Sequence, residues 1–357
     1  MPHPLELMVP EGFEQVAFGH DAASGLLAIV ALHSTVLGPG LGGVRFYPFR
    51  DEEAALVDVC RLARGMTYKH AVAGLDQGGG KAVIIGDPAL LRSDELIRAY
   101  ARFIDGLGGR YVTAEDVGTT QADMDLIRTI TPHVSGISED RGGSGDPSPA
   151  TALGVRWAMK AVAERLWDDG SLEGRHVVIN GVGKVGGALA DHLHSEGVRL
   201  TVADVRPEAA AAAAARTGAE VVGPDDAHAV PCDVYSPCAL GGALSARTIP
   251  ELRTAAVVGC ANNQLATPQD AQRIADAGVL YAPDYVANAG GVINIAEEKG
   301  GYDRARAEER IRGIRHTVLR VCDLAAAEGI TTAAAADRLA ERRIAAARVR
   351  RERAGQS

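Results

Sequence analysis

The sequence predicts an α/β protein of two domains, the first built on a mixed sheet and the second on a doubly wound parallel sheet. Its 357 residues correspond to two domains at about 150 residues each. Apolar residues make up 46% and charged residues 23%, as in ordinary globular proteins. In the second half of the chain, strand and helix patterns alternate, which indicates right-handed βαβ units and a parallel sheet.

Charge and composition exclude several classes of protein. The formal net charge is −9, which argues against a general binder of nucleic acids or anionic membranes. No apolar run approaches about 18 residues, and the N-terminus has no secretory pattern, so we expect a cytoplasmic protein without a membrane span. The cysteines lack metal-ligand spacing, which indicates reduced thiols and no metal site: Cys60, Cys232, Cys238, Cys260 and Cys322.

The first domain is expected to span residues 1–147. Apolar runs at 15–18 and 26–32 flank a turn-forming segment and predict a pair of strands. Residues 52–66 carry apolar side chains at spacings of three and four, which predicts an amphipathic helix. The other expected elements are strands at 82–85 and 111–113 and a helix at 94–107 that Ser93 caps.

Residues 138–149 mark the boundary between the domains. This segment is rich in Gly, Ser, Asp and Pro, which is typical of a flexible linker. The second domain is expected to span 148–330 and to begin with a helix over 150–167, followed by a buried strand at 176–180. Its further elements are helices at 188–197 and 209–215 and strands at 200–203, 257–258 and 279–281.

A glycine pattern follows the strand at 176–180 and opens the next helix. Gly181 permits a tight turn, Gly183 lets a pyrophosphate approach the backbone, and Gly186 lets the helix close on the strand. Asp204 ends the following strand, where a carboxylate binds ribose hydroxyls and repels a 2′-phosphate. The context predicts a Rossmann domain that binds NAD rather than NADP, although the nearby Arg206 weakens that preference. The alternative is a plain glycine turn beside a surface aspartate.

Two lysines and an aspartate form a second candidate constellation. The run Gly78–Lys81 lacks the remaining residues of a phosphate loop, so we expect its glycines to let a substrate approach the backbone and to place Lys81 in a cleft. Lys69 lies twelve residues earlier. Two ammonium groups in one cleft repel each other, which lowers the pKa of a lysine and favours the neutral amine that a general base requires. Asp116 follows a strand and is positioned to hold an ammonium group. Structural ion pairs explain these residue types equally well.

Seven segments in order resemble the Glu/Leu/Phe/Val family of amino-acid dehydrogenases, and within it the leucine and valine dehydrogenases. The resemblance covers nearly the whole chain. The segments are 37–43, 63–69, 78–81, 110–119, 236–241, 261–265 and 281–292.

The resemblance implies NAD-dependent, reversible oxidative deamination of branched-chain aliphatic L-amino acids (Leu, Val, Ile) to 2-oxo acids and ammonia. It implies that Lys69 binds the substrate carboxylate with Asn262 and the backbone of Gly42 and Gly43, that Lys81 is the general base, and that Asp116 holds the amine and transfers protons. It also implies a homo-oligomer, an octamer or a dimer, in which the C-terminal helix 331–357 packs on the first domain. The arginines of that helix fit helix-dipole compensation or subunit contacts better than binding of nucleic acid.

The same resemblance assigns the remaining contacts. Leu41, Ala114, Val292 and Ile295 line the side-chain pocket, which excludes acidic substrates because none of them pairs with a charge. Ile295 replaces a more usual valine, which favours valine over leucine by about 1–3 kcal/mol. Met66 also contacts substrate, and the cofactor residues are Thr151, Gly181, Val182, Gly183, Lys184, Val185, Gly186, Asp204, Val205, Ala239, Leu240, Asn262 and Asn288.

Two alternatives remain open. One is a phenylalanine- or tryptophan-type dehydrogenase on the same scaffold, against which the small pocket argues. The other is a non-catalytic NAD-binding protein, which the presence of Lys69, Lys81, Asp116 and Asn262 disfavours.

Overall fold

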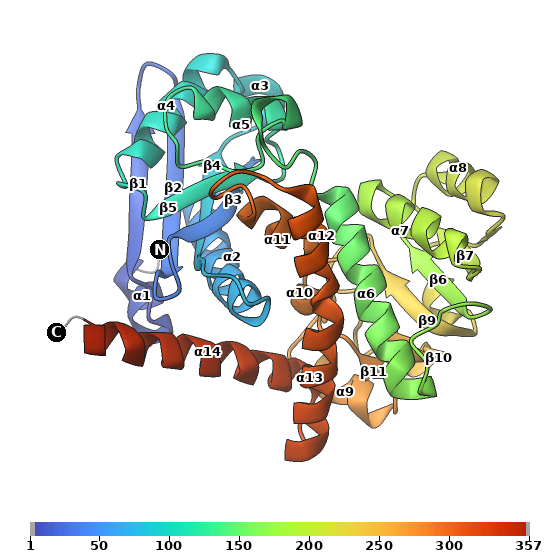
Figure 1. The fold of residues 1–357 in the computed structure, drawn as a ribbon. Coiled ribbons are helices and arrows are strands. Elements are labelled where there is room, and N and C mark those ends of the chain that lie inside the picture. Colours follow the sequence, from blue (N-terminus) through green and yellow to red (C-terminus); the bar gives the residue numbers. More distant parts are fainter. Residues whose placement is uncertain (1–3, 355–357) are drawn as a thin grey trace. The chain divides into compact units, whose positions relative to one another are not determined.

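The computed structural model describes residues 4–354, which fall into two compact units (Figure 1). Within the described range, unit 1 comprises residues 4–146, 295–304 and 340–354, and unit 2 comprises residues 147–294 and 305–339. This division differs from the continuous ranges expected from the sequence. The segment 295–304 groups with unit 1 because it packs there, with Glu298 accepting hydrogen bonds from the backbone of Gly136 and Ser144.

Unit 1 is built on a five-stranded mixed sheet, as predicted. Strand order is β1-β2-β4-β3-β5. Strand β2 is antiparallel to β1 and β4, whereas β3 is parallel to β4 and β5. The strands are β1 (Gln15–Asp21), β2 (Leu26–Ser34), β3 (Gly40–Tyr47), β4 (Gly78–Ile85) and β5 (Tyr111–Glu115).

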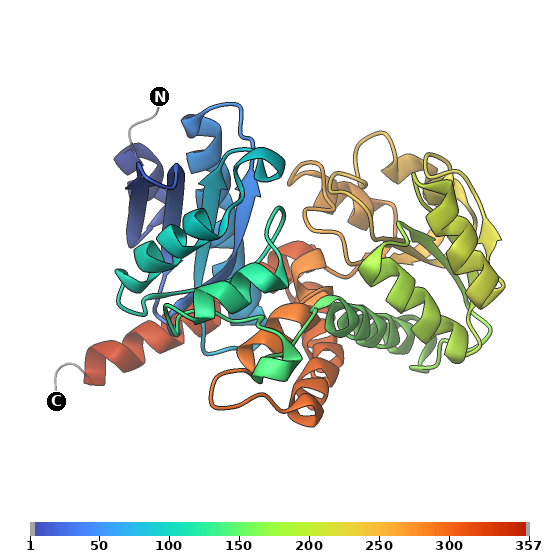
Figure 2. The same ribbon diagram turned by 90° about the horizontal axis from the view of Figure 1, so that it is seen from above.

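Helices cover both faces of this sheet (Figures 1 and 2). Helix α2 (Glu52–Val72) packs its apolar stripe on one face, and α4 (Asp94–Asp105) and α5 (Gln121–Arg128) pack on the other. Asp51 and Ser93 cap α2 and α4 by accepting hydrogen bonds from backbone N–H groups of the first turn. The short helices are α1 (Pro4–Glu11) and α3 (Pro88–Leu91).

The glycine-rich strands differ from the expectation. Strand β3 was not predicted, because glycine disfavours strands. The triple glycine belongs to β4, and protein atoms fill the space beside each of its residues: a side chain on Gly79 would overlap Thr67 of α2, and one on Gly80 would lie 2.7 Å from the Tyr111 ring. The prediction that these glycines admit a substrate is therefore wrong, since they let helix α2 and the Tyr111 ring pack closely on β4.

The segment 138–149 is packed rather than flexible. It contains the short turn η1 (Glu139–Arg141), and residues 143–145 are buried. The N–H of Ser144 donates to the Glu298 carboxylate at 2.6 Å. The prediction of a flexible linker is wrong because these long-range contacts order a sequence whose composition is typical of linkers.

Unit 2 is built on a parallel sheet of six strands, in the order β11-β10-β9-β6-β7-β8. The chain starts at β6, builds outward through β7 and β8, and then returns to the other side of β6 with β9. This is the doubly wound arrangement predicted, and its strand order reverses between β6 and β9. The strands are β6 (His176–Asn180), β7 (Arg199–Ala203), β8 (Glu220–Val221), β9 (Cys232–Pro237), β10 (Thr254–Val257) and β11 (Leu280–Tyr281).

The helices of unit 2 include α6 (Ser148–Trp167), which α13 (Ile314–Glu328) packs against. Helix α14 (Thr332–Ala354) begins in unit 2, and its residues from 340 onward group with unit 1, where Arg343 donates to the Asp76 carboxylate at 2.8 Å. The remaining helices are α7 (Lys184–Ser195), α8 (Pro207–Thr217), η2 (Ala227–Ala229), η3 (Ile249–Glu251), α9 (Asp270–Asp276), α10 (Asp284–Ala287), α11 (Gly290–Ala296) and α12 (Arg304–Arg312).

Candidate active site

A lysine–aspartate ion pair forms the centre of the candidate site in unit 1. Lys81 lies in β4 and Asp116 follows β5 directly, and the Lys81 Nζ is 2.5 Å from Asp116 Oδ2. The side chains are only 10% and 18% exposed. Burial opposes ionisation of Asp116, but the charges of Lys81 and Arg45 and its hydrogen bonds outweigh it, so the pKa of Asp116 is below its usual value.

The backbone of Gly42 and Gly43 borders this ion pair. A Cβ atom added to Gly43 would lie 2.8 Å from the Cβ of Asp116, and one added to Gly42 would lie 3.5 Å from the Cδ of Lys81. The Tyr111 hydroxyl donates to the Gly42 carbonyl at 2.5 Å and fixes that segment. The structure therefore brings together Lys81, Asp116 and the two glycines.

The last turns of α2 carry Met66 and Lys69, both partly exposed, and the buried His70. The Nδ1 of His70 lies 2.7 Å from the carbonyl oxygen of Gly78. Burial lowers the pKa of His70 to about 4, and the positive charges of Lys69, Arg343 and Lys81 add to this effect. Because both lysines act on one imidazole, they share one region of unit 1.

Three of the four aliphatic residues expected to line the side-chain pocket form one cluster. Leu41, Ala114 and Ile295 pack together in unit 1, with Val112 against them. The fourth, Val292, is partly exposed and belongs to unit 2.

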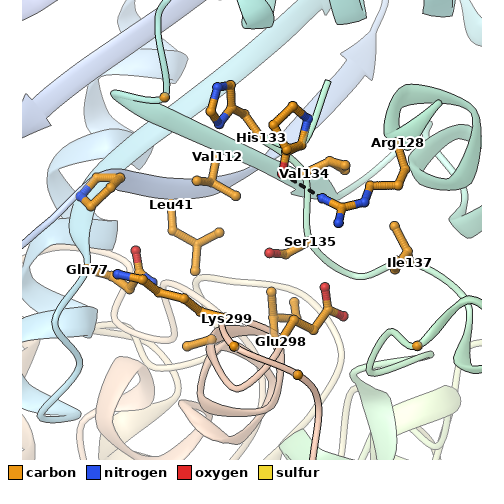
Figure 3. A pocket seen from close by; sticks show the side chains of 18 of the residues that line it. Leu41, Gln77, Val112, Arg128, His133, Val134, Ser135, Ile137, Glu298 and Lys299 are labelled. Atoms are coloured by element: carbon orange, nitrogen blue, oxygen red, sulfur yellow. Dashed lines mark hydrogen bonds between the residues drawn. The ribbon is translucent and has the colours of Figure 1, made fainter. Parts of the chain in front are cut away.

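A cavity of about 590 Å³ adjoins this cluster, and Leu41, Val112 and Ile295 line it. Figure 3 shows Leu41 and Val112 on one side of the space and Glu298 and Lys299 opposite them. The wall also includes Gln77, which is 9% exposed and whose Oε1 accepts no hydrogen bond from any residue in the described range 4–354. Sequence reasoning missed this cavity because its lining comes from segments far apart in the chain.

In unit 2 the glycine fingerprint has the geometry that a dinucleotide requires. Gly181 has φ +107°, and a side chain on Gly186 would overlap the carbonyl oxygen of Gly181. Gly183 is open, since an added Cβ would meet only Arg206 Nη2, at 3.9 Å. Gly183 precedes α7 and, as a glycine, has no side chain that could accept hydrogen bonds from the first turn of this helix. The backbone N–H groups of that turn are therefore suited to bind a pyrophosphate.

Asp204 lies at the end of β7, at the position that binds the ribose in Rossmann domains. Its Oδ2 accepts from the N–H of Val182 at 2.9 Å and its Oδ1 from the N–H of Arg206, also at 2.9 Å. Burial opposes ionisation, but these hydrogen bonds and the Arg206 charge keep the pKa of Asp204 below its usual value. The residue is therefore a carboxylate held against the glycine turn, which fits NAD.

The other residues expected at the cofactor come from several elements of unit 2, with Thr151 in α6 and Asn288 directly after α10. Val205 and Leu240 are 80% and 84% exposed. Asn288 is buried and donates to Asn262 Oδ1 at 2.8 Å. Further residues of this set are the half-buried Thr151 and Val185 and the exposed Lys184 and Ala239.

Two contacts to Asp116 were not foreseen. The Arg45 Nε lies 3.8 Å from Asp116 Oδ2, and the Thr119 hydroxyl accepts from the N–H of Asp116 at 3.0 Å. Arg45 follows Val44, which pairs with Glu115 across β3 and β5, so a prediction of β3 in this register would have placed Arg45 beside Asp116.

A doubly wound unit with a dinucleotide turn, together with a unit that holds a buried lysine–aspartate pair, defines a nicotinamide-dependent dehydrogenase. Residues 10–133 match the family described as Glu/Leu/Phe/Val dehydrogenase, dimerisation domain, and residues 142–207 and 201–351 match Glutamate/Leucine/Phenylalanine/Valine dehydrogenase. The chain belongs to this family, and it is an amino-acid dehydrogenase that uses NAD.

Relatives of known activity match nearly the full length. The leucine dehydrogenase of Geobacillus stearothermophilus is 52% identical over 93% of this chain and 90% of its own. The valine dehydrogenase of Streptomyces albus is 51% identical over 95% of this chain and 94% of its own. The crystal structure of L-tryptophan dehydrogenase from Nostoc punctiforme superposes with a TM-score of 0.85 at 43% identity, covering 96% of this chain and 99% of that one.

Residues 4–354 contain neither a candidate membrane span nor a cluster of metal-ligating side chains. No helix in this range combines the length and apolar composition needed to cross a membrane. Within the same range, no three His, Cys, Asp or Glu side chains converge as a metal site would require.

Proposed function

We propose that the chain catalyses reversible oxidative deamination of branched-chain aliphatic L-amino acids, with leucine, valine and isoleucine as substrates and 2-oxo acids and ammonia as products. One observation carries this proposal: the buried Lys81–Asp116 pair lies beside the Gly42–Gly43 backbone, and Leu41, adjacent to Gly42, belongs to a purely aliphatic cluster. Reactive groups and an apolar recognition surface are thus contiguous in unit 1.

The aliphatic cluster selects the substrate side chain. Leu41, Ala114 and Ile295 offer no partner for a charge, so an acidic side chain would lose its hydration without compensation. Lys69 supplies the positive charge for the substrate carboxylate, and Met66 borders the substrate one turn earlier on α2. The roles expected of Asn262 and Val292 toward the substrate stay predictions.

Lys81 and Asp116 perform the proton transfers. When bound, NAD would supply the acceptor for a hydride from the substrate α-carbon, and the substrate would then carry an iminium group. Lys81 then takes a proton from the water that attacks this carbon, and the resulting carbinolamine releases ammonia. Before Lys81 accepts that proton its ammonium must release one to water, and Asp116, whose Oδ2 is 2.5 Å from the Lys81 Nζ, holds the substrate amine and transfers protons at that nitrogen.

Unit 2 binds the cofactor. The turn Gly181–Gly186 and the N-terminus of α7, with Lys184 and Val185, receive the pyrophosphate. Asp204 binds the ribose hydroxyls and Val205 lies beside them. Thr151, Ala239, Leu240, Asn262 and Asn288 complete the proposed site.

The test combines a substrate panel with two variants. Initial rates are measured with leucine, valine, isoleucine, glutamate, phenylalanine and tryptophan, each with NAD and NADP. Lys81→Ala removes the base, and Lys81→Arg keeps the cation but cannot release a proton at neutral pH. Both variants should lose about 10²- to 10⁴-fold in kcat, and full activity in either would exclude Lys81 as the base.

A second candidate is a phenylalanine- or tryptophan-type dehydrogenase. The cavity favours it, because a space of about 590 Å³ shares Leu41 and Ile295 with the aliphatic cluster. Turnover of phenylalanine or tryptophan equal to or better than that of leucine would establish this alternative.

We also propose a homo-oligomer, an octamer or a dimer, located in the cytoplasm. The family description of residues 10–133 as a dimerisation domain supports self-association. Light scattering after size exclusion measures the mass, and a monomer of 37.2 kDa would exclude the proposal.

A further inference from the structure

Two cysteines lie side by side in unit 2, where Cys238 directly follows β9 and Cys260 lies three residues beyond β10. The parallel register pairs Val257 of β10 with Tyr235 of β9. Beyond the strand ends, the Ala261 N–H donates to the Pro237 carbonyl, so the segments that carry Cys238 and Cys260 stay adjacent.

The Cys260 thiol lies against Cys238. The Cys260 Sγ lies 3.7 Å from the carbonyl oxygen of Cys238, and the Ser236 hydroxyl lies 3.3 Å from the Cys238 Sγ. The Cys260 thiol lowers the pKa of the Cys238 thiol, and Ser236 adds to this against the effect of burial, whereas the pKa of Cys260 is raised. Cys238 is therefore the thiol that ionises first, with Cys260 as its neighbour.

Accessibility separates this pair from two other cysteines. Cys238 and Cys260 are both partly exposed, whereas Cys60 and Cys322 are buried in the cores. Burial raises the pKa of Cys60 and of Cys322 to about 11. A small oxidant in solvent therefore meets a reactive thiol at Cys238 before it reaches the buried pair.

We propose that Cys238 and Cys260 are an oxidation site, at which a hydroperoxide forms a disulfide that weakens dinucleotide binding. The Cys238 thiolate attacks hydrogen peroxide, the O–O bond breaks, and a sulfenic acid and one water result after uptake of a proton. The Cys260 sulfur then attacks the Cys238 sulfur, the S–O bond breaks, and a second water leaves. In total, two thiols lose two hydrogens and two electrons, and one peroxide becomes two waters.

The backbone around both sulfurs holds the dinucleotide turn. The N–H of Cys238 donates to the carbonyl of Asn180, directly before the turn, and a Cβ on Gly186 would lie 3.2 Å from the Cys238 Cβ. Ala239 packs on Gly181, and Asn288 donates to the Cys260 carbonyl at 3.1 Å. A disulfide requires a sulfur separation of about 2.05 Å, so closing the bond draws together two segments that contact the turn.

The test oxidises the full-length protein with hydrogen peroxide and reads two quantities. Intact mass and peptide mapping without reductant report the disulfide, and titration of protein fluorescence with NADH reports affinity. The wild type should lose two hydrogens in mass, show a 238–260 cross-link and lose NADH affinity, all reversed by dithiothreitol. Cys260→Ser should form no cross-link and keep the NADH affinity of its own reduced state, and the control Cys322→Ser should respond as the wild type does.

Three results would overturn the proposal: no 238–260 cross-link in the wild type, a cross-link that leaves NADH affinity unchanged, or an equal loss of affinity in oxidised Cys260→Ser. The link to affinity rests on the proposed role of the Gly181–Gly186 turn. Neither the disulfide nor the NADH affinity is measured through amino-acid turnover. The test therefore gives a clear result even if the chain does not catalyse the proposed deamination.

Discussion

Substitution of Ile295 by valine tests how the aliphatic cluster selects substrates. Ile295 is 8% exposed and packs with Leu41 and Ala114 in unit 1. Ile295→Val removes one methylene and enlarges the space left for a substrate side chain. Burial of one methylene contributes about 0.8 kcal/mol, and 1.4 kcal/mol corresponds to a factor of ten. We therefore expect the ratio of kcat/KM for leucine to that for valine to rise about fourfold.

The assay measures initial rates of NADH formation with leucine, isoleucine and valine at saturating NAD. The matched control is Ile293→Val, since Ile293 lies on the same helix α11 and is 2% exposed, but it is not part of the cluster. Each variant should lose about 0.5–1.5 kcal/mol of unfolding free energy, so thermal unfolding confirms comparable disturbance. An unchanged or reduced leucine-to-valine ratio in Ile295→Val, or an equal rise in the control, would refute the assignment.

Three further predictions follow from the structure. Gly79→Ala should lower the free energy of unfolding, measured by urea titration, by about 1–3 kcal/mol, because the added Cβ would overlap α2. The control is Gly65→Ala, at an open site within α2, which should not destabilise the protein. Asp204→Ala should raise kcat/KM for NADP relative to NAD, and an unchanged ratio would exclude Asp204 as the ribose-binding residue. The pKa of His70 is about 4 in the folded protein, against the usual 6.5. Between these two pH values the imidazole is protonated mainly in the unfolded chain, so the free energy of unfolding decreases as the pH is lowered. Its share of the loss from pH 7 to pH 5 is about 2 kcal/mol, which His70→Gln should remove and the exposed control His20→Gln should leave in place.

The parts of the fold that the sequence predicted are those that depend on local pattern. Apolar spacing indicated α2 and α4, and α2 extends to Val72, beyond the predicted end at residue 66. The alternation of strands and helices indicated the parallel sheet of unit 2, and the glycine fingerprint indicated its turn, because turn, strand and helix are adjacent in the chain. Strand β3 was missed, since its glycines suit close contacts with β4 and β5 that only the folded sheet creates.

For the candidate site, too, the sequence indicated the residues but not their contacts. Residue types and spacing pointed to Lys69, Lys81 and Asp116, but nothing local distinguished reactive groups from surface ion pairs. The contact between Lys81 and Asp116, with Arg45 beside them, depends on the order β4-β3-β5 in the sheet.

The amino-acid sequence by itself determined helices α2 and α4, the alternation of strands and helices in unit 2 and the dinucleotide turn, because these depend on neighbours a few residues apart. Only the tertiary structure decided that residues 295–304 pack with unit 1, that the triple glycine accommodates a helix, and that Cys238 meets Cys260. Such contacts join residues far apart in the chain, and the register and order of the strands that bring them together are set by packing of the whole sheet.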